Sequence, residues 1–284
     1  MLELEQIVER VKDLPALPQI TRRVISLTDD PNSTAKDLND VISQDQSLTA
    51  SVLRLANSAY YGFPRRISTV TEAIILLGFN AIRGLVLAAS VHDVLNREMS
   101  GYALGQGELW RHSYACGIGA RIIARRVKFP IIDQAFTAGL LHDIGKVVLN
   151  FFLQDVYQEV TRRIEKEKVP FMVAEATVLG FDHAAVGARV AEAWNLPVEL
   201  AEPIAYHHQP MAAPNHRRLA AIVHVSDAIC IMMGIGLGID GLCYPLDPQA
   251  LELLELDQAA VEQVMSQLAD GLVDWQDFPV SSKK

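Results

Sequence analysis

Residues 41–62, VISQDQSLTASVLRLANSAYYG, carry the pattern of an amphipathic helix. Leu48, Val52 and Leu55 recur at intervals of four and three residues, with polar positions between them. The same 3.6-residue period runs through nearly every long segment of the chain. No stretch combines sustained polar–apolar alternation with hairpin turns, so strands are not required. We therefore predict an all-α fold.

Local chemistry marks where several helices begin. Thr34 precedes Asp37, and Thr69 precedes Glu72, at the three-residue spacing of a capping box. Asp182 stands before an apolar-periodic run and has the side chain of a good N-cap. These positions predict helices that start directly after residues 34, 69 and 182.

Two glycine-rich breaks divide the chain. The first is NREMSGYALGQG at 96–107, and the second is GIGLGIDGLCYPLDP at 234–248, which precedes an acidic helix predicted at 251–268. We expect one structural unit made of three parts, an N-terminal helical sub-domain packed on a helical bundle that carries the chemistry, and an acidic C-terminal helix with its tail; their predicted ranges are 1–96, 97–245 and 246–284.

Composition limits the classes of function. The chain has 284 residues, of which 50% are hydrophobic, and its net charge is −9. Because half of the residues are apolar, we predict a folded globular protein. An acidic chain without a cluster of Lys and Arg is a poor phosphate-backbone binder, so we expect no nucleic-acid partner.

The sequence also favours a cytoplasmic location. Its three cysteines have no CxxC spacing, which argues against a disulfide framework and fits a reducing compartment. The acidic, amphipathic start does not resemble a signal peptide. The longest apolar stretch, 73–91, is interrupted by Asn80 and Arg83, so we expect no membrane span.

Residues 138–149, AGLLHDIGKVVL, contain the candidate chemistry, inside a helix expected to begin near Asp133. His142 and Asp143 are adjacent in an apolar segment, where unsatisfied polar groups are costly. Imidazole with carboxylate suits a divalent first-row metal ion. Lys146 lies three residues after Asp143 on about the same face and could neutralise it or bind an anion. A hydrogen-bonded core pair is the alternative interpretation.

Further histidines and acids alternate with the predicted helices. Such residues can converge when facing helices form a bundle, and seven ligands would suffice for two bridged ions. Solvated histidines at helix ends, or an Asp227 that bonds to His224, are the alternatives. The additional candidates are His112, His183, His207, His208 and Asp227, with Glu108 one turn before His112 as a further possibility.

This order of ligands resembles the HD superfamily of metal-dependent phosphohydrolases, in which it runs His…His-Asp…Asp. The resemblance implies that His112, His142, Asp143 and Asp227 form the core quartet. The additional histidines resemble the two-metal HD-GYP branch, which hydrolyses cyclic di-GMP. That branch implies ligand roles for His183, His207 and His208, and phosphate contact by Lys146 if the protein is an enzyme.

The chain departs from the HD-GYP branch after its double histidine. That branch continues with Glu and a Gly-Tyr-Pro element, whereas this chain continues with Gln209-Pro210. The departure argues against a cyclic di-GMP pocket even if metals bind.

The N-terminal half points to a closer family. LPALPQITRRVISLT, then the 41–62 segment and then ISTVTEAIILLGFNAIRGLVL resemble, in order, the HDOD family (HD-related output domain), with a resemblance from Leu14 to Pro210. It implies a bacterial signal-transduction output protein whose partners are signalling proteins such as receiver domains. The seven ligand positions imply one or two divalent ions, with Fe, Mn, Zn and Ni all compatible. The alternatives are a metal-dependent phosphohydrolase acting on a nucleotide or cyclic dinucleotide, and a metal-free scaffold.

Overall fold

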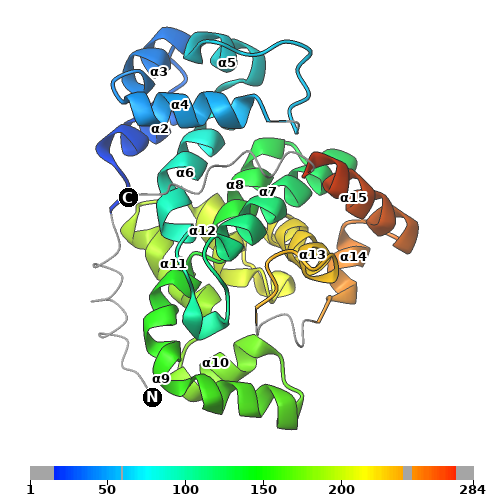
Figure 1. Cartoon of the computed structure of the whole chain (residues 1–284). Coiled ribbons are helices and arrows are strands. Elements are labelled where there is room, and N and C mark those ends of the chain that lie inside the picture. The colour runs from blue at the N-terminus through cyan, green and yellow to red at the C-terminus, as the bar shows by residue number, and fades with distance from the viewer. Residues whose placement is uncertain (1–15, 59, 239–244, 273–284) are drawn as a thin grey trace. The chain divides into compact units, whose positions relative to one another are not determined.

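The computed structural model describes residues 16–58, 60–238 and 245–272 (Figure 1). Within these residues every regular element is a helix, and the only β-type pairing is an isolated bridge between Met99 and Leu104. The all-α prediction is therefore confirmed. The described residues fall into two compact units, Leu17–Asp93 together with 269–272, and Val94–Leu268 together with Ala16.

Within the described residues the smaller unit holds five helices, the last of which continues to Leu95, and its predicted helix starts agree with the structure. Thr34 accepts a hydrogen bond from the Asp37 N–H, and Asp37 accepts one from the Thr34 N–H, which completes a capping box. Thr69 caps in the same way, but the reciprocal bond to Glu72 comes from the Ser68 N–H. The helices are α2 (Gln19–Asp29), α3 (Ala35–Ile42), α4 (Gln46–Ala56), α5 (Val70–Leu77) and α6 (Phe79–Leu95).

The larger unit is a helical bundle in which α7 packs against both α8 and α13, and α9 packs against α10, α11 and the short 3-10 helix η1. Its elements are η1 (Ser100–Tyr102), α7 (Glu108–Arg126), α8 (Ile132–Leu141), α9 (Gly145–Glu167), α10 (Phe171–Leu179), α11 (His183–Ala193), α12 (Val198–Tyr206), η2 (Pro210–Ala212), α13 (Arg217–Met232), α14 (Pro248–Leu253) and α15 (Gln258–Gly271).

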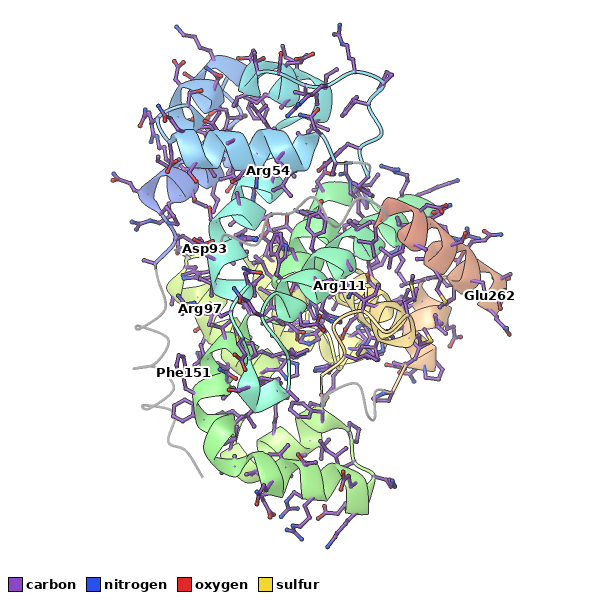
Figure 2. All side chains as sticks on the ribbon, viewed as in Figure 1. Arg54, Asp93, Arg97, Arg111, Phe151 and Glu262 are labelled. Carbon is purple, nitrogen blue, oxygen red and sulfur yellow. The ribbon has the colours of Figure 1, made fainter. Side chains whose placement is uncertain are left out.

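Helix α7 lies in the interior of the bundle and buries nearly all of its side chains. Its side chains from Leu109 to Ala124 are buried except for Arg111, which is exposed and labelled in Figure 2. Arg54 on α4 and Glu262 on α15 are exposed in the same way. The next residue after Arg111, His112, is buried, so α7 carries it into the interior.

Two predicted helices differ from the structure. The acidic helix predicted at 251–268 is two helices, because Glu255 adopts a left-handed conformation (φ 54°) and Asp257 caps a new start at the Ala260 N–H. The helix expected to run through His142 and Asp143 ends at Leu141, and α9 begins at Gly145.

The division of the chain into the ranges 1–96, 97–245 and 246–284 stays a prediction. Parts of these ranges, namely 1–15, 239–244 and 273–284, lie outside the described residues. The segment Ile132–Leu153 is long and apolar enough to cross a membrane by length and composition, with mean hydropathy 1.3. Because 89% of it is buried, it reads as a core segment of the bundle, and it is weak evidence for a span.

Candidate metal centre

Six separate segments of the larger unit bring the candidate residues together. Asp182 caps α11 through the Ala185 N–H and so makes His183 the first residue of that helix. His207 is the C-cap of α12, and His208 follows it. The contributing segments are α7 with His112, the α8–α9 turn with His142 and Asp143, α9 with Lys146, α11 with His183, the end of α12 with His207 and His208, and α13 with Asp227.

The turn between α8 and α9 presents Asp143 to the centre of the cluster. Its backbone bonds span three residues, from Ile144 N–H to Leu141 O at 3.0 Å and from Lys146 N–H to Asp143 O at 2.9 Å. Such bonds tighten the chain into a 3-10 turn. Gly145 is required after it, since a Cβ there would lie 1.9 Å from the His183 carbonyl oxygen. The turn and the close approach of α11 explain why the predicted continuous helix was wrong.

One half of the cluster gathers on Oδ2 of Asp143 and on Asp227. His112 Nε2 lies 2.9 Å from Asp227 Oδ1 and 3.7 Å from Asp143 Oδ2. His142 Nε2 lies 3.4 Å from Asp143 Oδ2 and 3.6 Å from Asp227 Oδ1. The Lys146 ammonium is 2.6 Å from Asp143 Oδ2, as its spacing predicted. We call His112, His142 and Asp227 the first subset.

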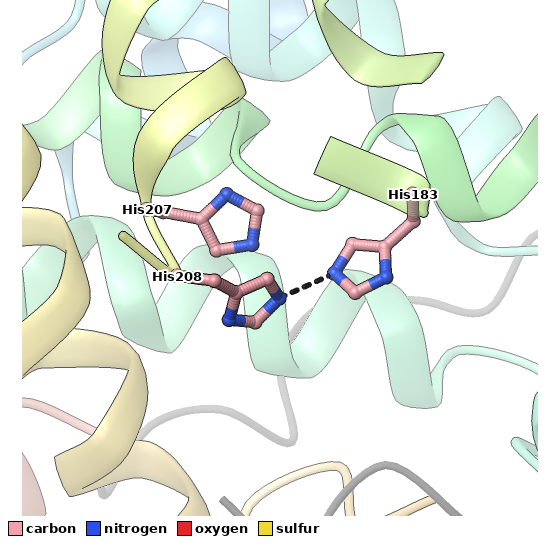
Figure 3. Close-up of side chains that lie close together, drawn as sticks. All are labelled: His183, His207 and His208. Carbon is pink, nitrogen blue, oxygen red and sulfur yellow. Dashed lines mark hydrogen bonds between the residues drawn. The ribbon is translucent and has the colours of Figure 1, made fainter. Parts of the chain in front are cut away.

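The other half gathers on Oδ1 of Asp143. His183 Nε2 lies 3.4 Å and His207 Nε2 3.9 Å from that oxygen. His208 Nε2 is 2.8 Å from His183 Nε2, the contact drawn in Figure 3. We call His183, His207 and His208 the second subset. Asp143 therefore lies between the two subsets with one oxygen towards each.

Four histidines direct the same ring nitrogen to the centre because the other one is held from behind. The Nδ1 atoms of His112, His142 and His207 lie 2.9, 2.7 and 2.8 Å from the carbonyl oxygens of Ile235, Gly139 and Ile204. The Nδ1 of His183 lies 2.6 Å from Oε2 of Glu175. A proton on each Nδ1 leaves the Nε2 lone pair available, which is how proteins orient histidines that bind metals.

Burial and hydrogen bonding favour a metal over a satisfied core cluster. None of His112, His142, Asp143, His183, His207 and Asp227 exposes more than 3% of its surface. His142 Nε2 and His207 Nε2 are buried and make no hydrogen bond within the described protein. A buried ring nitrogen without a partner is costly, and a cation at the centre would satisfy both atoms. Three groups within the cluster are close enough to share an ion: His112 with His142 and Asp227, His142 with Asp143 and His207, and His183 with His207 and His208.

The ionisation states of Asp143, His207 and His208 also suit metal binding. Burial alone would raise the pKa of Asp143, but the positive charges of His142 and Lys146 hold it well below its usual range. Burial and the neighbouring imidazoles lower the pKa values of His207 and His208. Ionised carboxylates and neutral imidazoles are the forms that coordinate metals.

Without a bound cation three imidazoles are exceptions. Nearby carboxylates raise the pKa values of His112, His142 and His183, although burial alone would lower them. For His112 the hydrogen bond and charge of Asp227, followed by the charge of Asp143, raise the pKa to about 10. A metal would have to displace that proton, so metal uptake is expected to release protons.

All seven residues predicted as a metal set lie in this cluster, and Glu108 does not. Glu108 is half-buried and belongs to none of the three groups. Glu175 was not predicted from the sequence, although a carboxylate in the apolar helix FMVAEATVL is the same signal that singled out Asp227. A role for His224, whose Nδ1 lies 2.8 Å from the His207 carbonyl oxygen, was not predicted either.

A comparison with protein families matches the HDOD domain over residues 14–210. The chain belongs to the HDOD family. This match covers the resemblance inferred from the N-terminal motifs and includes every predicted ligand except Asp227.

Individual relatives of this HDOD protein are distant. An uncharacterized protein of Treponema pallidum (strain Nichols) is 27% identical over 209 residues, which are 73% of this chain and 40% of that relative. The chain therefore spans about 40% of the length of that curated relative.

Solved structures resemble nearly the full length of this HDOD chain. An HDOD domain protein with unknown function from Geobacter sulfurreducens has a TM-score of 0.70 at 29% identity, covering 94% of this chain and 89% of its own. A protein from Marinobacter aquaeolei VT8, described as a candidate signal transduction protein, has a TM-score of 0.67 at 27% identity. That match covers 95% of this chain and 59% of the Marinobacter chain.

Proposed function

We propose that this HDOD protein is a bacterial signal-transduction output protein that holds one or two divalent metal ions in its His/Asp cluster. The observation that carries the proposal is the convergence of four Nε2 atoms, each fixed by a partner on Nδ1, around two carboxylates. The orphaned Nε2 atoms of His142 and His207 support it. The description of the Marinobacter relative supports the signalling role.

The donor set fits two ions better than one. His112, His142 and Asp227 would hold one ion with Oδ2 of Asp143, and the second subset would hold another with Oδ1. Four donors on each side match the coordination number that first-row metals accept from protein side chains. A bound metal ion would supply a concentrated positive charge in the buried interior of the helical bundle. The donors suit Fe, Mn, Zn and Ni alike.

Partners of the protein are proposed to be signalling proteins such as receiver domains, bound in the cytoplasm through the N-terminal half. Ile75 and Leu76 on α5 support this assignment, because they expose 71% and 46% of their surface. Large exposed apolar side chains in adjacent positions are typical of protein contacts.

Hydrolysis of cyclic di-GMP is not favoured. After His208 the chain turns at Gln209 into η2, which contains neither the Glu nor the Gly-Tyr-Pro element of the hydrolytic branch. Lys146, the residue that would hold phosphate, is buried against Asp143.

Elemental analysis of protein purified without a His-tag or added metal tests the proposal. Wild type should carry about one to two divalent ions per chain, as such donor sets require. Asp143→Ala should lose most of this metal and the stability that metal binding confers. Asp133→Asn, which alters an acid at the other end of α8 that pairs with Arg121 at 2.9 Å, is the matched control and should retain its metal.

Two results would overturn the proposal. A metal-free wild type whose stability Asp143→Ala leaves unchanged would leave only a scaffold. Robust metal-dependent hydrolysis of cyclic di-GMP that vanishes in Asp143→Ala would instead make the protein an enzyme.

A further inference from the structure

Glu175 is a buried carboxylate. One of its oxygens faces His183 of the second subset, and the other faces Tyr102. The Glu175 side chain is fully buried within α10. Oε2 accepts hydrogen bonds from the backbone N–H of His183 at 3.1 Å and from its Nδ1 at 2.6 Å. Oε1 accepts the hydroxyl of Tyr102 at 2.5 Å. Three donors on one buried carboxylate fix its position.

Tyr102 reaches Glu175 because η1 is held tightly against α9. The Gly101 N–H donates to Asn150 Oδ1 at 2.8 Å. A Cβ on Gly101 would lie 2.8 Å from the Leu153 Cβ and 2.9 Å from the Asn150 carbonyl oxygen, so only glycine permits this approach. The fold thus places a phenol at the back of the cluster with little freedom to move.

The Tyr102 ring packs against both His183 and Lys146. It meets the His183 ring edge-on at 6.4 Å between centroids, and the Lys146 ammonium lies 5.6 Å above it. The phenol therefore packs against the second subset and against the cation that neutralises Asp143. These contacts link η1 to the cluster through packing as well as through the hydrogen bond.

His183 differs from the other three oriented histidines in the charge of its partner. His112, His142 and His207 are held by neutral backbone carbonyls, whereas His183 is held by a carboxyl group. A carboxylate on Nδ1 makes Nε2 a stronger electron donor than a carbonyl does, and it also fixes the tautomer. Of the four oriented histidines, the one held by a carboxylate belongs to the second subset, so the second subset differs from the first in this respect.

We propose that Glu175 and Tyr102 are positioning residues that set the metal affinity of the second subset separately from that of the first. The inference rests on the proposed function, because it assigns a role towards the same metal cluster. Glu175 supplies the charge that strengthens His183 as a ligand. Tyr102 holds that carboxylate in line, so its effect should be the smaller one.

Titration of cobalt(II) into metal-free protein, followed by visible absorption and elemental stoichiometry, tests the inference. Glu175→Gln keeps a similar shape and an oxygen that can accept the His183 proton, so it removes chiefly the charge. Wild type should bind two ions. In Glu175→Gln one of them should bind roughly 10–100-fold more weakly while the other is unchanged, in line with the loss of a partner to a metal-bound histidine. Tyr102→Phe should weaken the same ion by less than about tenfold.

The controls separate this inference from the proposed function. Asp133→Asn removes a charge at the far end of α8 and should titrate like wild type. Normal circular dichroism of each metal-free variant shows that the fold is intact, and Tyr102→Phe tests the inference if Glu175→Gln does not fold. A folded Glu175→Gln that binds cobalt as wild type does would overturn the inference and leave the proposed function standing. A wild type that binds no cobalt would overturn both.

Discussion

Replacing Gly145 by alanine should destabilise the protein, although the same change normally stabilises a helix. Alanine is favoured over glycine by about 1 kcal/mol within a helix. At Gly145, however, the added Cβ would lie 1.9 Å from the His183 carbonyl oxygen and 2.5 Å from the Gly187 backbone nitrogen. Both neighbours are backbone atoms of α11, so no side-chain rotation can relieve the contact.

The size of the effect follows from the movement required. A Cβ essentially never approaches another heavy atom within 3.0 Å, so α9 and α11 must separate by about 1 Å. A gap of that size forfeits a quarter to a half of the dispersion energy across the contact. Overpacking of a core costs roughly 1–3 kcal/mol. Because backbone atoms are involved, we expect a net loss of about 2–3 kcal/mol after the helix-propensity gain.

Thermal unfolding followed by circular dichroism measures this loss. A unit of this size changes its Tm by about 2–4 °C per kcal/mol, so the melting temperature should fall by roughly 4–12 °C. Gly105→Ala is the control, because the nearest atom to its added Cβ is Glu108 Cγ at an ordinary 3.8 Å. A Gly145→Ala protein that melts at or above the wild-type temperature would refute the close approach of α9 and α11, and with it the placement of His183.

Three other predictions concern side chains outside the proposed metal ligands. Burial alone would raise the pKa of Glu202, but hydrogen bonds from the Asn215 side chain and the His216 and Asn215 N–H groups hold it below its usual range. The ionised Glu202 therefore stabilises the fold above pH 4.5, and this stabilisation is lost as the pH falls through the lowered pKa. In Glu202→Gln the free energy of unfolding should consequently fall less steeply with decreasing pH than it does in wild type. Burial raises the pKa of the Cys116 thiol well above its usual range, so mass spectrometry should find it unlabelled by iodoacetamide until the protein is denatured; rapid labelling in the native state would contradict its burial. Thr34→Ala removes an N-cap and should cost about 1 kcal/mol in chemical denaturation, whereas an unchanged midpoint would show that the cap contributes nothing.

The sequence predicted most of the helices because their starts depend on local chemistry. Thr34 and Asp182 cap the helices that follow them, as their side chains and spacing indicate. The C-terminal helix was predicted as one piece because its apolar period continues across residues 251–268. The helix is interrupted because the backbone at Glu255 is left-handed. Glycine is the usual residue in that conformation, so a glutamate gives no sequence signal of the break.

The candidate ligands inside apolar segments were predictable because a charged or imidazole group there needs a partner, and ligand roles for the histidines at helix ends followed from the family resemblance. The supports of these ligands were not predictable, since each depends on contacts between distant segments. Glu175 lies eight residues before His183, but Tyr102 is 73 residues before Glu175 and meets it only after η1 has docked on α9. His224 is a further support of this kind. In the structure it bonds through Nδ1 to the His207 carbonyl oxygen and accepts the Asp247 N–H at 2.9 Å through Nε2.

The break between α8 and α9 shows why a list of ligands does not yet define a site. In the continuous helix predicted through 142–146, His142 and Asp143 would project about 100° apart, and Asp143 would serve one face only. The observed turn instead leaves Asp143 between the two subsets, with Oδ2 towards His112 and His142 and Oδ1 towards His183 and His207. Gly145 permits that turn to lie against α11. The residue that makes a shared carboxylate possible is therefore one without a side chain, and hydrophobic periodicity does not register it.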